Sequence, residues 1–149
     1  MSSIETPAYE ISTDPARLDV TAIHAYLTRS YWSPGIPLDV VERAIRHSLC
    51  FGAYECRGGA QVGFARVVTD HATFGYLCDV YVLEAHRGHG LGKRMMREVM
   101  AHPALTGARR VMLATRDAHG LYARNGFVEA GRAGNLMEIV RPDIYSRKD

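Results

Sequence analysis

The chain has 149 residues, of which 47% are hydrophobic and 23% charged, and its formal net charge is only +2. This length and composition predict one globular domain over residues 1–149. The weak, scattered positive charge argues against nucleic-acid binding, which needs a clustered basic face. The sequence also has no run of 18 apolar residues, so we expect no membrane span.

The first half of the chain predicts one strand followed by two helices. Tyr9–Thr13 forms a short strand pattern, and Asp14 with Pro15 gives a helix-start signal, an N-cap residue before a proline at the first helical position. Apolar residues at helical spacing continue to Ser30, where the sequence SPGIP ends the helix. A second helical pattern follows over residues 40–49.

The rest of the chain predicts six strands and two helices. The glycines of Arg57–Gly59 mark a hairpin turn. The expected strands lie at 49–56, 60–70, 73–83, 109–115, 127–130 and 136–140, and the helices at about 91–102 and 117–126. A three-strand meander followed by a strand-helix-strand crossover predicts a mixed sheet with helices on its faces.

The stretch HRGHGLGKRMM, His86 to Met96, places three glycines within five positions at the start of a helix. It does not match a P-loop, because Arg87 stands where the first glycine belongs and Arg94 where Ser or Thr belongs. It does not match the dinucleotide G-x-G-x-x-G fingerprint either, because Lys93 or Met95 takes the last glycine position.

The pattern that remains is R-x-x-G-x-G, placed between an apolar strand and an amphipathic helix. Backbone N–H groups in the first turn of a helix are free, and glycine lets an anion approach them directly. We therefore expect a pyrophosphate-like anion on the backbone of seven consecutive residues: Arg87, Gly88, His89, Gly90, Leu91, Gly92 and Lys93. The side chain of Lys93 can equally be a surface cation.

With this motif and the later segment LYARNGF, the chain resembles the GNAT superfamily of acetyl-CoA-dependent N-acetyltransferases. The resemblance implies an α/β (α+β) fold with a mixed, mostly antiparallel sheet of about seven strands, four helices, and a splayed parallel strand pair around the cofactor. It also implies that acetyl-CoA is the co-substrate, with backbone groups of Tyr81, Val82 and Leu83 meeting its pantetheine arm. Thr115 departs from the pattern, since many members carry asparagine there; its hydroxyl either replaces the amide or caps the next helix.

Two residues are candidates for the chemistry. Tyr122 falls on the tyrosine of the family motif, where a phenol near the sulfur would protonate the departing thiolate; the alternative is an ordinary core aromatic. Asp79 interrupts an apolar strand, and strand alternation places Leu77, Asp79 and Tyr81 on one face. Its carboxylate either attracts or deprotonates the amine, or it is structural and pairs with an arginine such as Arg66.

The acceptor side is expected at Tyr31 and Trp32, which either stack on a substrate or anchor the loop through a buried tryptophan. The seven histidines and three cysteines lack metal-ligand spacing, so we expect no metal and reduced, buried thiols. Met1–Glu10 lacks the features of a secretory signal, which favours the cytoplasm.

These features predict an N-acetyltransferase that moves an acetyl group to a small-molecule primary amine by direct attack in a ternary complex. The alternatives are a non-catalytic acyl-CoA-binding or sensing module and a protein or peptide N-acetyltransferase. The expected partner is the amine acceptor, and the chain is a monomer or a homodimer.

Overall fold

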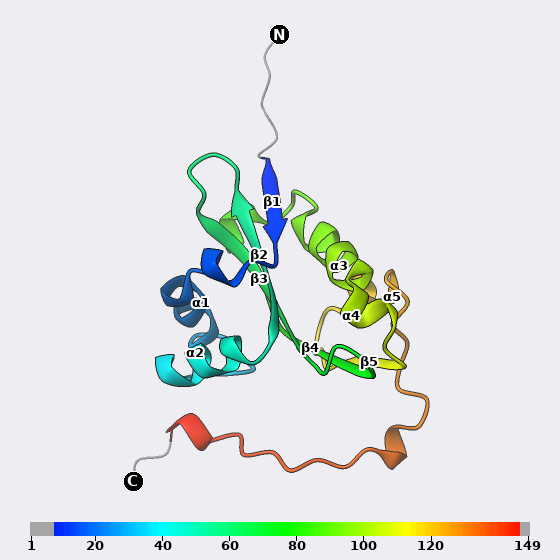
Figure 1. The fold of residues 1–149 in the computed structure, drawn as a ribbon. Coiled ribbons are helices and arrows are strands. Elements are labelled where there is room, and N and C mark those ends of the chain that lie inside the picture. Colours follow the sequence, from blue (N-terminus) through cyan, green and yellow to red (C-terminus); the bar gives the residue numbers. More distant parts are fainter. Residues whose placement is uncertain (1–7, 147–149) are drawn as a thin grey trace.

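The computed structural model describes residues 8–146, and a single five-stranded sheet lies at its centre (Figure 1). The strands follow chain order across the sheet: β1 (Tyr9–Ser12), β2 (Leu49–Glu55), β3 (Gln61–Thr69), β4 (Phe74–Val82) and β5 (Arg110–Leu113). Neighbours are antiparallel except β4 and β5, which run parallel. The expected meander and crossover are therefore present.

Helices cover both faces of this sheet and bury two apolar clusters against it. On one side lie α1 (Val20–Leu27) and α2 (Leu38–Arg46); on the other lie α3 (Leu91–Ala101), α4 (Pro103–Thr106) and α5 (His119–Ala123) (Figure 1). Met95, Met96 and Val99 of α3 are fully buried against the sheet, as its amphipathic pattern predicts. Short 3₁₀ turns occur at Pro15–Arg17, Glu84–His86, Ala133–Asn135 and Ile144–Ser146.

The first helix begins later than the sequence signal predicts. Asp14 caps only the 3₁₀ turn, where its Oδ1 accepts the Ala16 N–H at 3.0 Å, and the backbone becomes extended again at Leu18. Asp19 then caps α1 through a 3.1 Å hydrogen bond from the Ala22 N–H. Two capping aspartates stand five residues apart, and each of them starts its own element.

The expected counts of about seven strands and four helices are wrong. The additional helix is α4, which the sequence did not predict. Pro103 was expected only to end α3, but it starts this new helix, and the His102 Nδ1 caps α4 by accepting the Ala104 N–H at 3.0 Å. Residues 127–130 and 136–140 form no strands, because no strand within residues 8–146 pairs with them to supply ladder hydrogen bonds.

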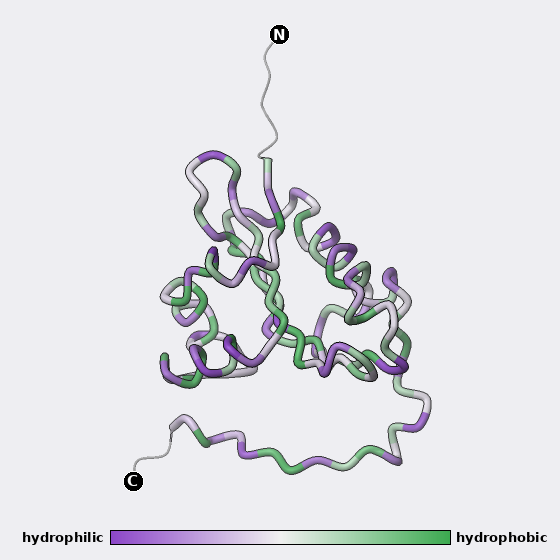
Figure 2. The backbone as a smooth tube through the Cα atoms, viewed as in Figure 1, coloured by the Kyte–Doolittle hydropathy of each residue, from purple (hydrophilic) through white to green (hydrophobic). Residues whose placement is uncertain are grey.

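Residues 128–146, here called the C-terminal arm, leave α5 and cross beneath the molecule toward α1 and α2 (Figure 1). Short hydrophobic segments alternate with hydrophilic ones along the arm, away from the body of the domain (Figure 2). Within the described part of the chain, no helix combines the length and the apolar character that crossing a membrane requires. Residues 1–7, which carry most of the N-terminal sequence considered above, lie outside the described part.

Strand β4 contains a bulge at Asp79, and this bulge reverses the expected alternation. Arg66 pairs with Cys78 and Phe64 with Tyr81, so three steps on β4 oppose two on β3, and Asp79 adopts a φ of 55°. Leu77 consequently packs in the cluster under α3, whereas Tyr81 packs in the cluster under α1 and α2. The prediction that Leu77, Asp79 and Tyr81 share one face is therefore wrong.

Candidate active site

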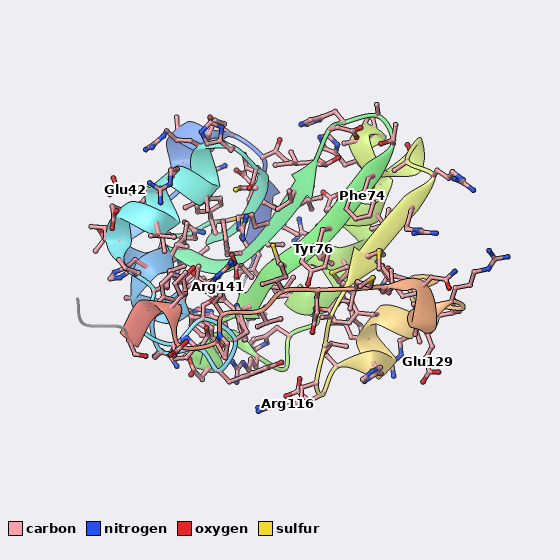
Figure 3. All side chains as sticks on the ribbon, turned by 90° about the horizontal axis from the view of Figure 1, so that it is seen from below. Glu42, Phe74, Tyr76, Arg116, Glu129 and Arg141 are labelled. Carbon is pink, nitrogen blue, oxygen red and sulfur yellow. The ribbon has the colours of Figure 1, made fainter. Side chains whose placement is uncertain are left out.

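A cleft of about 870 Å³ opens where the parallel strands part. Pairing between β4 and β5 ends at Leu77 and Leu113, and β4 continues to Val82 without that neighbour. The walls of the cleft come from β4, the α1–α2 loop, the start of α3, and the segment from β5 to α5. Figure 3 shows Tyr76 on the sheet at this wall and Arg116 in the loop that follows β5. The expected splayed pair is thus present, and it forms a wedge.

The glycine loop at one end of the cleft leaves its backbone accessible. Gly88 and Gly90 have φ values of 87° and 75°, which only glycine adopts without strain, and Gly90 is the N-cap of α3. The first hydrogen bond of α3 runs from the Arg94 N–H to the Gly90 carbonyl. Within residues 8–146, the N–H groups of the three residues before Arg94 have no hydrogen-bond acceptor.

Gly92 tests whether this loop fits a bound anion. It lies inside the first turn of α3 without a positive φ, and a Cβ added there would meet no protein atom within 4 Å. Neither backbone strain nor protein packing requires a glycine at this position. A ligand that lies directly on the amides would require it, because a side chain would fill the ligand's space. The residues present therefore fit a pyrophosphate group.

The neighbouring positions divide between backbone and side-chain roles. His89 and Lys93 are exposed at the surface, whereas the Leu91 side chain is buried in the core, so Leu91 has only its backbone to offer. The Arg87 side chain points away from the loop: its Nε donates to the Val82 carbonyl and its Nη2 to the Tyr26 hydroxyl, both at 3.0 Å. Arg87 therefore joins α1 to the end of β4.

Of the three β4 positions expected to meet a pantetheine arm, Val82 faces the wedge. The Leu83 N–H already donates to the Val62 carbonyl of β3 at 2.8 Å, and Tyr81 is paired with Phe64. Because successive residues direct their backbone groups to opposite sides, Val82 directs its N–H away from β3. Val80, which follows the bulge, also lies in the cleft wall. The sequence reasoning missed Val80, because no local pattern marks the bulge beside it.

Asp79 lies in the cleft wall and is held by two donors. Arg66 Nε donates to its Oδ2 at 2.7 Å, and Trp32 Nε1 donates to its Oδ1 at 2.9 Å. Arg66 also donates from Nη1 to the Ser48 hydroxyl at 3.0 Å. The Asp79 side chain is only 8% exposed, so the ion pair is largely shielded from solvent. The Asp79–Arg66 pair is the one expected if Asp79 has a structural role.

Tyr122 lines the opposite side of the cleft from α5. Its ring packs edge to face on Phe127, with 5.9 Å between the centroids. Burial, with smaller contributions from Tyr31 and Asp117, raises the pKa of Tyr122 above its usual value. The phenol is therefore protonated at neutral pH and can donate a proton or a hydrogen bond.

Tyr31 and Trp32 form an aromatic pair in the α1–α2 loop, with ring centroids 5.0 Å apart and edge to face. Tyr31 is 47% and Trp32 37% exposed, so Trp32 is not buried as the alternative expected, although its indole N–H anchors the loop to Asp79. The Arg116 guanidinium lies 3.7 Å from the centroid of the Tyr31 ring, which brings the loop after β5 into contact with the α1–α2 loop across the cleft. Sequence reasoning missed Arg116, since no local pattern marks it.

Thr115 lines the cleft, and its Oγ1 accepts the Ala118 N–H at 3.1 Å just before α5. Its hydroxyl thus organises the turn into the helix that carries Tyr122. Cys50 is buried and Cys78 half-buried, but Cys56 is exposed, so the prediction of three buried thiols fails at Cys56. Within residues 8–146, no three His, Cys, Asp or Glu side chains gather as a metal site needs.

A family model for the acetyltransferase (GNAT) family matches residues 9–127, so the chain belongs to this family, and its enzyme class is acetyltransferase. The relative named "Putative acetyltransferase FG08082", from Gibberella zeae, is 40% identical and covers 78% of this chain, which spans 77% of that protein. A glucosamine 6-phosphate N-acetyltransferase from Oryza sativa subsp. japonica is 41% identical over 37% of this chain and 34% of its own.

Solved structures show the same fold. A GNAT-family protein from Xanthomonas campestris pv. campestris superposes with a TM-score of 0.91 at 51% identity, covering 96% of this chain and 100% of its own. Rv2747 from Mycobacterium tuberculosis, solved in complex with CoA, has a TM-score of 0.63 at 23% identity and covers 81% of this chain and 72% of its own.

Proposed function

We propose that this acetyltransferase uses acetyl-CoA to acetylate the primary amine of a small molecule by direct attack in a ternary complex. The observation that carries the proposal is one continuous cleft, which is lined by Arg87 and Gly92 of the glycine loop, by the unpaired end of β4 and by Tyr122. This cleft can hold two reactants side by side, which converts a bimolecular step into a nearly unimolecular one.

The residues that would hold acetyl-CoA lie in a row along one side of the cleft. The free N–H groups at Leu91, Gly92 and Lys93 suit its pyrophosphate, and the positive end of α3 lies behind them. The Val82 N–H would meet the pantetheine arm, and Val80 lies beside it in the same cleft wall. Acetyl-CoA supplies the activated acyl group as a thioester. An N–H beside the thioester carbonyl polarises it, which is the role of an oxyanion hole.

Tyr122 is the group we assign to the departing thiolate. Its raised pKa keeps the phenol protonated across the neutral range, as a general acid requires. Tyr122 lines the cleft, and edge-to-face packing on Phe127 limits the orientations of its ring.

Asp79 would anchor the amine as a carboxylate. Arg66 and Trp32 hold both of its oxygens in place through hydrogen bonds. This fixed negative group would attract the incoming ammonium and take one of its protons, directly or through water, so that the neutral amine can attack the thioester carbonyl. The contact between Tyr31 and Arg116 joins two walls of the same cleft, and we take this to favour a small acceptor over a peptide chain.

The decisive experiment combines two measurements. The first is a calorimetric titration with CoA, and the second is an acetylation assay over a panel of amines in which the release of free thiol is measured. The panel includes amino sugars and their phosphates, because one relative is named for glucosamine 6-phosphate. Binding with turnover of one amine supports the proposal. Binding without turnover of any amine would favour the sensing module, and turnover of peptides alone would favour a protein N-acetyltransferase.

The cysteines bear on where in the cell the protein works. Cys50, Cys56 and Cys78 are unpaired thiols, which persist in a reducing compartment such as the cytoplasm. A cytoplasmic location, with no metal and no nucleic-acid partner, is part of the proposal.

A further inference from the structure

Three arginines line the cleft, and two of them are already committed to other groups of the protein. Arg29 donates to both carboxylate oxygens of Glu84, at 2.8 and 2.9 Å. Arg87 is held by the two hydrogen bonds described above. Arg116 differs from both, because within the part of the chain that the structure describes it makes no hydrogen bond and no ion pair. The cleft therefore contains one guanidinium whose donors are unused.

Tyr31 holds this unused guanidinium in place without occupying its donors. The Arg116 guanidinium carbon lies over the Tyr31 ring, 3.7 Å from its centroid. An arginine stacked on an aromatic face keeps its N–H groups at the edge of the guanidinium plane, where a carboxylate or phosphate can accept two of them in parallel. Asp117, the next residue, forms no ion pair with Arg116 within residues 8–146, and its charge acts on Tyr122 instead. Arg116 is thus oriented, exposed and ready to pair with an anion.

A continuous series of contacts connects Arg116 with Asp79. Tyr31, which lies under Arg116, packs against Trp32 with 5.0 Å between the ring centroids, and the Trp32 indole N–H donates to Asp79 at 2.9 Å. The free cation and the carboxylate assigned to the amine therefore belong to the same part of the cleft. Each Asp79 oxygen accepts one hydrogen bond from the protein, and each keeps a further lone pair for an ammonium.

We propose that the acceptor is an amine that also carries an anionic oxyacid group, a carboxylate or a phosphate, and that Arg116 binds this group while Asp79 receives the ammonium. This inference rests on the proposed function and narrows its substrate class. Arg116 acts as a specificity-determining residue, because a neutral amine leaves its guanidinium without a partner and a diamine places a second positive charge against it.

A fluorescence titration tests this recognition without requiring turnover. Trp32 is the only tryptophan of the chain, and it lies between Arg116 and Asp79 in the series of contacts. The probes are ω-amino carboxylates, ω-amino alkyl phosphates and ω-amino alcohols of matched chain lengths, added to the protein in the presence of CoA. We expect the acid-bearing amines to bind about 10- to 100-fold more tightly than the alcohols, as a hydrogen-bonded charge pair provides. The carboxylate and phosphate series then show which of the two acids fits.

Substitutions of Arg116 connect this preference to one side chain. Arg116→Gln should remove the preference while leaving the Kd of CoA unchanged, and Arg116→Lys, which keeps the charge but not the paired donors, should retain part of it. Arg124→Gln is the matched control, since Arg124 is an exposed arginine at the end of α5 outside the cleft. The proposal is overturned by equal binding of acids and alcohols, by binding of no amine at all, or by a preference that survives in Arg116→Gln. It is also overturned if Arg116→Gln weakens CoA binding instead.

An acetylation assay on the same probes keeps this inference separate from the proposed function. The expected result is turnover of the acid-bearing amines with kcat/KM values that follow the binding preference. Turnover of all the amines without preference for an acid would overturn the role of Arg116 and leave the proposed function standing. Acid-dependent binding with no turnover of any amine would support the role of Arg116 and remove the proposed function.

Discussion

The indole N–H of Trp32 donates to the Asp79 carboxylate across 2.9 Å, and this hydrogen bond joins the α1–α2 loop to the bulge of β4. The two residues are 47 positions apart in the chain. The bond connects the segment expected to meet the amine with the strand expected to meet acetyl-CoA. The position of the acceptor loop therefore depends on the conformation of β4.

Replacement of Trp32 by phenylalanine keeps an aromatic ring but removes the donor to Asp79. We expect the KM of the amine to rise about tenfold, while the Kd of CoA stays unchanged, because a lost hydrogen bond to a charged group is worth about 1.5–3 kcal/mol. Steady-state kinetics with calorimetry measures both. Tyr31→Phe keeps its ring beneath Arg116 and serves as the control, which should behave like the wild type. If Trp32→Phe weakened CoA binding as much as amine binding, Trp32 would have no specific role in positioning the acceptor loop.

Asp79→Asn should reduce both stability and amine binding. The charge of Arg66 would lose its partner in a largely shielded site, at a cost of about 3 kcal/mol in the free energy of unfolding. The double variant Arg66→Gln with Asp79→Asn should recover much of that stability but not the amine KM. Urea unfolding and kinetics on the three variants separate the two roles. A double variant with normal kinetics would leave Asp79 purely structural.

Tyr122→Phe should cut kcat with little change in the Kd of CoA. Removal of a general acid typically costs 10²- to 10⁴-fold. The raised pKa of Tyr122 means that the acid form is complete at neutral pH and is lost only as pH rises above the ordinary tyrosine range. The wild type should therefore show a falling limb at high pH, and the variant should not. Unchanged turnover would remove Tyr122 from the chemistry.

Gly92→Ala should separate stability from CoA affinity. Alanine is favoured in a helix by about 0.5–1 kcal/mol, and the added methyl meets no protein atom, so the protein should become slightly more stable. The same methyl occupies the space of the pyrophosphate, so the Kd of CoA should rise at least tenfold. Gly107→Ala at the end of α4 is the control, and its CoA affinity should not change. Equal affinity in both variants would place the pyrophosphate elsewhere.

The three thiols should react with iodoacetamide at very different rates. Burial raises the pKa of Cys50 to about 12 and that of Cys78 to about 11, so both are protonated at neutral pH, whereas Cys56 is exposed. Peptide mass spectrometry should find Cys56 modified first. Since Cys78 lines the cleft, bound CoA should slow its reaction further and leave Cys56 unaffected.

Local patterns in the sequence determined much of the fold and one end of the site. Strand and helix periodicities predicted the meander and α3, and R-x-x-G-x-G predicted the exposed amides. These features could be predicted because each depends on residues that are close together in the sequence. The bulge at Asp79, the contact of Arg116 with Tyr31 and the use of the Leu83 N–H were decided only in three dimensions. Each of these features depends on residues that are distant in sequence, so no periodic pattern in the sequence could predict it. The same reason explains the arm: LMEIV has the pattern of a strand, but a strand forms only where another strand's backbone is available to pair with it.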